Sequence, residues 1–335
     1  MTPDARAQTV RPEFEAPDYP LKPPAPGPGP LPTERLEIQR EAVRPDFRIT
    51  SLMPDRTGAL WVGSWRGIAQ IDPNTGRVLA RVSLPNTVVG AIEQDRSNRL
   101  WIGTYDGLMR VDPRSDEITA QNFSLPSNRV QDLLIDQRGY LWVGGDRGLA
   151  LISPDQGLLM TTVRNLPGVS ANALTLDQRG NLWVGTLDGL VRVDTASAFI
   201  TGRVPQLPGL AVNALTVDRF GTLWAGTAAG LIVVNPLTGR VERNVTSMRG
   251  RTIRDLKFDT TYNFLWVGTD DGLFLINPYS GAIVQQILDL PSSQILALSP
   301  NTGNKLWIGT SEGLAWLGLD REAARSHWTF SGDGR

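Results

Sequence analysis

Cysteine is absent from this chain of 335 residues, and histidine occurs once, as His327. The lack of cysteine excludes disulfides, thiolate chemistry and Cys-ligated metals. A single histidine excludes a histidine cluster as a metal site and argues against a Ser-His-Asp arrangement. The sequence therefore predicts no cofactor, no metal site and no catalytic residues, and a protein that is not an enzyme. Hydrolysis by carboxylates alone stays open as a disfavoured alternative.

A surplus of charge of one sign is also absent, because 33 Lys and Arg balance 34 Asp and Glu. Nucleic-acid and anionic-membrane binding rest on a basic face, so we expect neither partner. No run approaches the roughly 18–20 apolar residues of a membrane span, so we expect no membrane insertion. The first residues lack the apolar stretch of a signal peptide, although Ala5-Arg6-Ala7 before Gln8 resembles a cleavage site. We expect a periplasmic or extracellular location, with the cytoplasm as the alternative.

What the chain does contain is a phrase repeated seven times, Leu-Trp-x-Gly-x-x-x-Gly-[Leu/Ile]. Its tryptophans follow one another at intervals of 40 to 42 residues, and they are Trp61, Trp101, Trp142, Trp183, Trp224, Trp266 and Trp307. A period of about 40 residues with turn residues inside each unit is typical of a four-stranded propeller blade. The sequence thus predicts an all-β fold, a seven-bladed β-propeller with four antiparallel strands per blade.

The repeated tryptophan has one expected role, packing between blades. Each blade must bury two apolar faces, and a Trp side chain supplies about 150–250 Å² of apolar surface. An Asp also recurs at the end of the first strand of six units, and Asn301 takes the seventh place. These acidic residues lack the density of a calcium loop, so we expect each to bond to its own turn.

Three regions are expected from the positions of proline and of the repeat. Residues 1–35 contain ten of the 24 prolines, which predicts a disordered tail or a spacer. Residues 36–319 are predicted to form the propeller, and residues 320–335 a C-terminal tail. A Pro recurs sixteen residues before the Trp, and Pro45 is in that register. We therefore expect residues 36–43 to form the outer strand of the seventh blade and to close the ring. The alternative is closure by residues 326–330.

The unit Ala-Leu-x-x-Asp-x-x-Gly-x-Leu-Trp, clearest at residues 172–190 and 213–231, resembles the repeat of the two-component regulator propellers. The resemblance extends over residues 36–319. It implies a ligand-sensing domain of the kind that precedes a membrane span and a histidine kinase, neither of which occurs in this chain. The predicted propeller is also similar to the streptogramin lyases, whose catalysis depends on a histidine within the ring. His327 lies in the expected tail, so that activity is not expected.

Departures from the repeat indicate where a partner binds, because a binding site must differ from the average unit. The turns between second and third strands and the loops between blades should share one face. On it the first unit has Trp65-Arg66, the loop before the sixth unit has Arg249 and Arg251, and the sixth turn has Asp270-Asp271. Exposed Trp and Arg are enriched in interface hot spots. We predict a recognition surface here, with loop drift as the alternative.

A second set of candidates lies near the start of each first strand, where the series reads Thr50, Gly90, Gln131, Asn172, Asn213, Arg254 and Leu296. This mostly polar series is expected to face the central channel. Together with the first set, the predicted binding residues are Trp65, Arg66, Tyr105, Arg129, Gln131, Asn172, Asn213, Arg249, Arg251, Arg254, Asp270 and Asp271.

The function expected from these observations is a non-catalytic binding module, either a scaffold or a sensor that uses one face to bind a protein. The alternative is a propeller that senses a small molecule or a glycan at the channel mouth. We expect a monomer.

Overall fold

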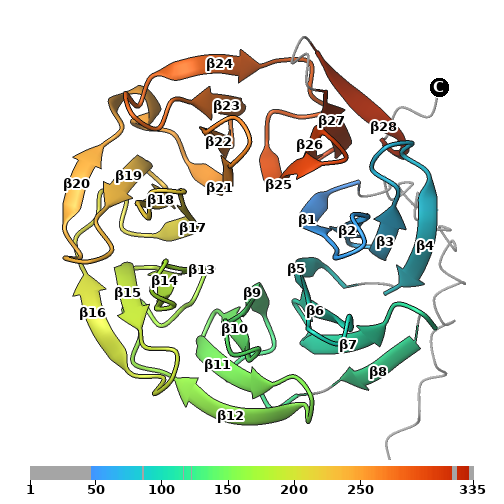
Figure 1. The fold of residues 1–335 in the computed structure, drawn as a ribbon, viewed down its shortest axis with the longest axis horizontal. Coiled ribbons are helices and arrows are strands. Elements are labelled where there is room, and N and C mark those ends of the chain that lie inside the picture. The colour runs from blue at the N-terminus through green and yellow to red at the C-terminus, as the bar shows by residue number, and fades with distance from the viewer. Residues whose placement is uncertain (1–46, 85–86, 116, 122, 319–322, 332–335) are drawn as a thin grey trace, which may run out of the picture. The chain divides into compact units, whose positions relative to one another are not determined.

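Seven four-stranded antiparallel sheets form a ring in the computed structural model, which describes residues 47–84, 87–115, 117–121, 123–318 and 323–331. Within each sheet the strands follow one another in sequence order, from the innermost to the outermost. The first strand of each sheet lies nearest the central axis and the fourth lies at the rim (Figure 1). The seven-bladed propeller with four strands per blade is therefore confirmed.

Blades are numbered in chain order. Blade 1 contains β1 (Ile49–Pro54), β2 (Leu60–Ser64), β3 (Gly67–Ile71) and β4 (Val78–Ser83). Blade 2 contains β5 (Val89–Gln94), β6 (Leu100–Thr104), β7 (Leu108–Asp112) and β8 (Glu117–Gln121). Blade 3 contains β9 (Val130–Ile135), β10 (Leu141–Gly145), β11 (Gly148–Ser153) and β12 (Leu158–Val163). Blade 4 contains β13 (Ala173–Leu176), β14 (Leu182–Thr186), β15 (Gly189–Val193) and β16 (Ile200–Val204).

The remaining three blades follow the same order. Blade 5 contains β17 (Val212–Val217), β18 (Leu223–Thr227), β19 (Gly230–Val234) and β20 (Val241–Asn244). Blade 6 contains β21 (Ile253–Asp259), β22 (Phe264–Thr269), β23 (Leu273–Ile276) and β24 (Ile283–Ile287), and a 3-10 helix η1 (Thr246–Met248) precedes it. Blade 7 contains β25 (Ile295–Thr302), β26 (Lys305–Thr310), β27 (Gly313–Leu317) and β28 (Ala324–Ser331).

The two repeated glycines have separate causes, which blade 5 illustrates. A Cβ on Gly226, in the second strand, would lie 2.4 Å from Ile253 Cγ2 of blade 6. No side chain fits there, because the next blade packs directly on the backbone. Gly230, in the turn to the third strand, has a φ of +143°, a conformation that L-residues rarely adopt.

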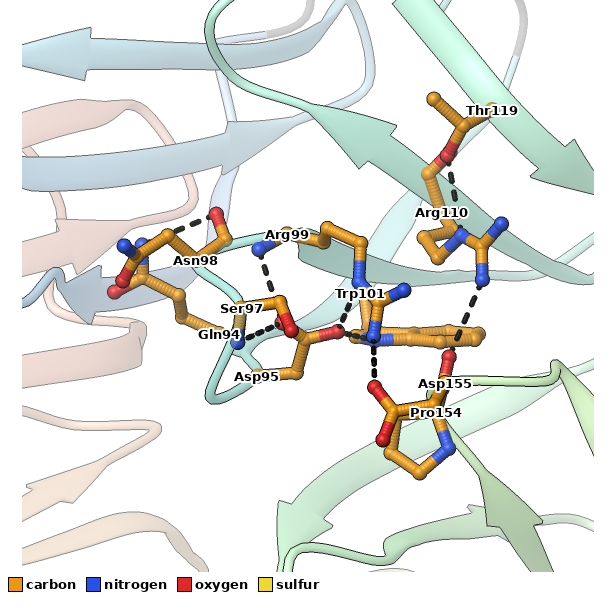
Figure 2. Close-up of polar contacts among 10 residues, drawn as sticks. All are labelled: Gln94, Asp95, Ser97, Asn98, Arg99, Trp101, Arg110, Thr119, Pro154 and Asp155. Atoms are coloured by element: carbon orange, nitrogen blue, oxygen red, sulfur yellow. Dashed lines mark hydrogen bonds and ion pairs between the residues drawn. The ribbon is translucent and has the colours of Figure 1, made fainter.

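The repeated tryptophans are buried between blades, as predicted, with at most 2% of their surface exposed. In blades 1 to 6 the indole Nε1 donates a hydrogen bond to the repeated Asp, as from Trp101 to Asp95 Oδ2 at 3.0 Å (Figure 2). The other oxygen of Asp95 accepts from the backbone N–H groups of Ser97 and Arg99 in its turn. The Asp therefore accepts hydrogen bonds both from the backbone of its turn and from a buried indole. In blade 7, Trp307 donates instead to the carbonyl of Thr302 at 3.1 Å.

A second repeated contact joins neighbouring blades through a cation. Arg110 packs its guanidinium 5.6 Å from the Trp101 ring and donates to Pro154 O of blade 3 at 3.2 Å (Figure 2). Arg192 repeats both contacts with Trp183 and with Pro236 O of blade 5. Arg243 of the outer strand β20 and Lys305 of β26 make equivalent contacts, at the junctions of blades 5 and 6 and of blades 7 and 1. These cations cover the tryptophans of blades 2, 4, 5 and 7 and tie each of these four blades to a turn of the next.

Closure of the ring differs from the sequence-based expectation. The outer strand of blade 7 is β28, which pairs antiparallel with β27, so the prediction that residues 36–43 take this place is wrong. Residues 1–46 lie outside the described residues, and so does the predicted Pro-rich tail. Because β28 extends to Ser331, the propeller continues past residue 319 into the expected C-terminal tail.

The physical reason for this error lies in what the repeated proline reports. Pro126, Pro167, Pro208 and Pro291 all lie in loops that lead into a first strand. A proline in this register therefore predicts such a loop, and it carries no information about the strand before it. A strand that directly follows β27 also closes only a short loop, which costs little conformational entropy.

His327 of β28 lies in the interface between blades 7 and 1. It is 3% exposed, its Nε2 donates to Gly76 O of blade 1 at 2.7 Å, and its Nδ1 accepts from Thr329 N at 3.3 Å. Lys305 donates to Pro73 O of the same turn at 2.6 Å. Beneath these contacts a shared core joins Ile49 and Val62 of blade 1 to Trp307 of blade 7.

The stability contributed by the interface between blades 7 and 1 should depend on pH through His327. Burial lowers the pKa of His327 below its ordinary value of about 6.5 in the unfolded chain. Its contribution to stability is therefore full above about pH 6.5 and is lost as the pH falls toward the folded-state pKa, because the unfolded chain then binds more protons.

We expect wild type to lose stability relative to His327→Gln between pH 7 and pH 5, measured by urea denaturation at each pH. Gln retains a neutral amide that can donate to Gly76 O. Because all other titrating groups are shared, the difference between the two proteins isolates His327. A difference that stays constant with pH would contradict this origin.

Candidate functional site

The turns between second and third strands share one face of the ring with the loops between blades. Backbone hydrogen bonds join the two sets, as from Gly189 N to Leu210 O at 3.0 Å and from Gly250 N to Ala229 O at 2.8 Å. This surface is called the turn face below, and the prediction that both sets lie on it is confirmed. The turns that carry the repeated Asp lie at the other end of the strands, on the opposite face.

Blades 1 to 3 contribute two cation–aromatic pairs to the turn face. Arg66 packs its guanidinium 5.3 Å from the Trp65 ring in the β2–β3 turn. Trp65 is half-buried and so less exposed than its turn position indicated. Arg129, in the loop before β9, lies 4.3 Å from the ring of Tyr105, which is 43% exposed. Such pairs hold long side chains in place at the surface.

The second predicted group lies on the loop before blade 6 and on blade 6 itself. Arg254 forms a bidentate ion pair with Asp270, with Nε–Oδ1 and Nη2–Oδ2 distances of 2.6 and 3.0 Å. Arg251 pairs with Asp271, and its guanidinium lies 4.5 Å from the Phe274 ring. The predicted arginine cluster is thus largely neutralised by the predicted aspartates. Arg249 is exposed.

The two groups do not adjoin. Blade 7 separates blade 1 from blade 6 around the ring (Figure 1). The predicted residues therefore form two separate groups on the turn face, one on blades 1 to 3 and one at blades 5 and 6.

The polar series of the first strands lines a central channel of about 610 Å³, as expected. Three of its members also tie blades together. Thr50 Oγ1 donates to Val89 O, and Asn172 Nδ2 and Asn213 Nδ2 donate to Val212 O and Ile253 O, the last two at 3.3 Å. Gln131 and Arg254 line the channel near them. Asn172 and Asn213 therefore have a structural role beside any role in binding.

Beside Arg56 of the β1–β2 turn, four charged residues of the first strands that sequence reasoning missed line the channel: Glu93 of β5, Asp132 of β9, and Asp255 and Lys257 of β21. A comparison of equivalent positions would have revealed them. The place of Asp132 and Asp255 is occupied in the other five blades by Ser51, Ala91, Ala173, Ala214 and Ala297. The place of Glu93 and Lys257 is occupied by Met53, Leu134, Thr175, Thr216 and Ser299.

Both channel aspartates accept hydrogen bonds from backbone N–H groups. Asp132 accepts from Leu174 N of blade 4 at 2.7 Å and from Leu133 N at 2.8 Å. Asp255 repeats this pattern with Leu298 N of blade 7 and Leu256 N, at 2.7 and 2.8 Å. The Lys257 ammonium lies 3.8 Å from Asp255 Oδ1.

Burial in the channel raises the pKa values of these carboxyl groups. Burial raises the pKa of Glu93 to about 7 and that of Asp132 to about 6. Burial also raises the pKa of Asp255, although Lys257 opposes the shift. The three carboxylates in turn raise the pKa of Lys257, and Asp255 does so most. Glu93 and Asp132 are thus held in surroundings that disfavour their charges.

The described residues offer no metal centre, because no three His, Cys, Asp or Glu side chains among them are placed to hold one ion. His327 lies on the outermost strand of blade 7 and is not among the residues that line the channel. Among the same residues, no helix has the length and apolar character needed to cross a membrane.

Fold and channel together define a seven-bladed β-propeller with charged residues in its central channel. The family described as "Two component regulator propeller" matches residues 83–106, 124–147 and 165–188. The chain carries two-component regulator propeller repeats, as its sequence indicated. No curated protein matches the chain.

Solved structures support the same assignment of fold. The extracellular domain of a putative one-component system from B. thetaiotaomicron has a TM-score of 0.70 at 22% identity and covers 80% of this chain. That of a putative hybrid two-component system from the same organism has a TM-score of 0.68 at 20% identity, over 81% of this chain. This chain spans 38% and 40% of the length of those two extracellular domains.

An enzyme shares the fold as well. Virginiamycin B lyase from Staphylococcus aureus has a TM-score of 0.67 at 12% identity, with 80% of this chain and 93% of that chain covered. The propeller alone therefore does not separate binding domains from enzymes.

Proposed function

We propose that this chain is a non-catalytic binding module that recognises its partner with the turn face and the mouth of the channel. The observation that carries the proposal is the distribution of departures from the repeat. The opposite face repeats its Asp turn in six blades. Stacked cations and Asp–Arg pairs occur on both faces, but the channel charges and the Arg251–Asp271 and Arg254–Asp270 pairs, in which no repeated Asp takes part, belong to the channel and the turn face.

A protein partner is the leading form of this proposal. Tyr105, Arg129 and Arg249 are exposed, and Tyr and Arg are among the side chains that contribute most in protein interfaces. The likeness to extracellular domains of bacterial sensors supports a sensor or scaffold outside the cytoplasm, in the periplasm or at the cell surface.

The test compares three immobilised proteins: wild type, a turn-face variant with Tyr105→Ala, Arg129→Ala and Arg249→Ala, and a control with Phe220→Ala and Tyr279→Ala. The control residues are 54% and 62% exposed and lie in turns of the opposite face. All substituted side chains are exposed, so we expect melting temperatures close to that of wild type.

Proteins from cells that make this chain would be passed over each sample and identified by mass spectrometry. We expect one partner to be retained by wild type and by the control and to be lost by the turn-face variant. Equal retention by all three proteins would remove the turn face from consideration.

Binding of a small molecule or a glycan in the channel is the second candidate. The observation that favours it is the channel itself, because about 610 Å³ lies within the range of roughly 300–1,000 Å³ of ligand pockets. A ligand that raises the melting temperature saturably, with loss of the effect in channel variants, would give this candidate the lead.

A further inference from the structure

The junction of blades 7 and 1 contains a cavity of about 280 Å³. β28 reaches the rim of blade 1 beside β4 (Figure 1), and residues of both strands line the cavity. Arg66 of the β2–β3 turn also lines it, which places the cavity at the turn-face end of the junction. Its apolar walls include Ile49, Ile68, Val82 and Phe330. No residue is shared with the lining of the central channel, so this is a separate site.

The way in which the ring closes accounts for the cavity. At other junctions the loop between blades places a buried apolar residue in the core, and four such residues are Leu84, Leu166, Leu207 and Met248. β28 and β1 are the last and the first strands of the ring, so no loop joins them. Among the described residues, the core of this junction consists of strand residues alone.

An irregularity of β28 shapes one wall of the cavity. Gly313 pairs with Ser331 and Ala315 with Ser326, so a step of two residues on β27 lies opposite a step of five on β28. The extra residues form a bulge, which bends a strand and redirects its side chains. Thr329 and Phe330 of this bulge line the cavity.

The polar side chains of the cavity offer donors that have no acceptor. Within the described residues, neither the Arg66 nor the Arg81 guanidinium is paired with a carboxylate. Thr329 Oγ1 is buried and has no hydrogen-bond partner among the same residues. A buried hydroxyl without a partner is costly, so a ligand that brings an acceptor would satisfy it. The missing component of this site is therefore an anion.

Blade 1 is the one blade with arginine at both of these positions. The position of Arg66 is occupied in blades 2 to 7 by Asp106, Arg147, Asp188, Ala229, Asp271 and Glu312. The position of Arg81, opposite the third residue of the third strand, is occupied by Gln121, Thr162, Arg203, Asn244, Gln286 and Ser326. Six blades form without this pair of cations, so the fold does not require it.

We propose that the cavity binds a small organic acid, whose carboxylate accepts hydrogen bonds from Arg66, Arg81 and Thr329 while its apolar body packs on Ile49 and Phe330. A guanidinium group matches the geometry of a carboxylate or a phosphate. The carboxylate is the smaller of the two, and a cavity just below the roughly 300–1,000 Å³ of typical ligand pockets leaves it more room for an apolar body. This site goes beyond the proposed function, because it involves neither the channel nor the residues of the turn-face variant.

Isothermal titration calorimetry of the full chain with octanoate and with 3-phenylpropanoate, in about 0.15 M salt to screen non-specific attraction, tests the proposal. We expect one site, with binding about tenfold or more weaker in Arg66→Gln and in Arg81→Gln. The neutral amides of both acids lack the charge, and acetate lacks the apolar body, so none of them should bind comparably. Arg203→Gln is the matched control, because Arg203 takes the position of Arg81 in blade 4 and is also exposed.

Thr329→Val separates a role in binding from a role in the fold. Valine has nearly the same shape as threonine and removes the unpaired hydroxyl. The free protein should therefore melt at the temperature of wild type or above it, while the acid should bind about tenfold more weakly. A structural role of this hydroxyl would instead lower the melting temperature of the free protein.

The proposal is overturned if neither acid binds, if the neutral amides bind as tightly as the acids, or if Arg203→Gln weakens binding as much as Arg81→Gln does. Wild-type affinity in Thr329→Val would also contradict it. Binding that survives both Arg66→Gln and Arg81→Gln and is lost in Lys257→Gln would place the acid in the channel instead. None of these results affects the turn-face proposal, because retention of a partner is measured on other residues.

Discussion

A chain that ends at Gly318 is expected to lose the single cooperative unfolding transition of the ring. It lacks β28, and with it the outer cover of β27 and the hydrogen bond from His327 to Gly76 O. The core that joins Ile49 and Trp307 is then exposed at its rim. Loss on the order of 5 kcal/mol or more is comparable with the whole stability of a typical domain. Scanning calorimetry would show a broad transition or none.

The matched control is a chain that begins at Pro45 and retains β28. If the C-terminal strand completes blade 7, this control keeps the melting temperature of the full chain. A control that melts as early as the chain ending at Gly318 would restore closure by residues 36–43.

The second large effect is expected for Trp183→Ala. Trp183 is 1% exposed within the core between blades 4 and 5, and its indole donates to Asp177 Oδ2 at 3.2 Å. Truncation leaves a cavity and removes one hydrogen bond from a buried carboxylate, which together cost about 3–5 kcal/mol of unfolding free energy. Urea denaturation monitored by circular dichroism measures it.

Trp328→Ala supplies the comparison, because Trp328 is 77% exposed. Its change in unfolding free energy should stay within about 0.5 kcal/mol. If Trp183→Ala cost less than about 1 kcal/mol, the repeated tryptophan would not be the main packing element between blades.

How far the sequence leads can be judged from three sets of residues. The tryptophans and aspartates recur at one spacing in almost every unit, so their shared role in packing and turns follows from the sequence alone. His327 could not be placed in this way, because β28 contains no repeated phrase and its pairing depends on chain geometry. The position of Pro45 led to the wrong prediction of closure by residues 36–43, because a proline in such a loop does not indicate whether a strand precedes it.

The channel charges were missed for a different reason. Asp132 and Glu93 are ordinary residues in local sequence, and they stand out only when equivalent positions in seven blades are compared. The predicted arginines show the converse. Arg251 and Arg254 appeared as a basic cluster, but the aspartates that neutralise them come from a turn sixteen or more residues away. Pairing between separate loops is a three-dimensional property, which local spacing does not contain.

Because β28 follows β27 directly, every pair of neighbouring strands within a sheet is also consecutive in sequence. Each blade can therefore assemble as soon as its own 40 or so residues have left the ribosome, and it needs only its predecessor to pack against. The contacts of Lys305 with Pro73 and of His327 with Gly76 span 232 and 251 residues. Synthesis thus proceeds through a growing arc of finished blades, and the ring forms only when the last strand emerges and meets the first blade made.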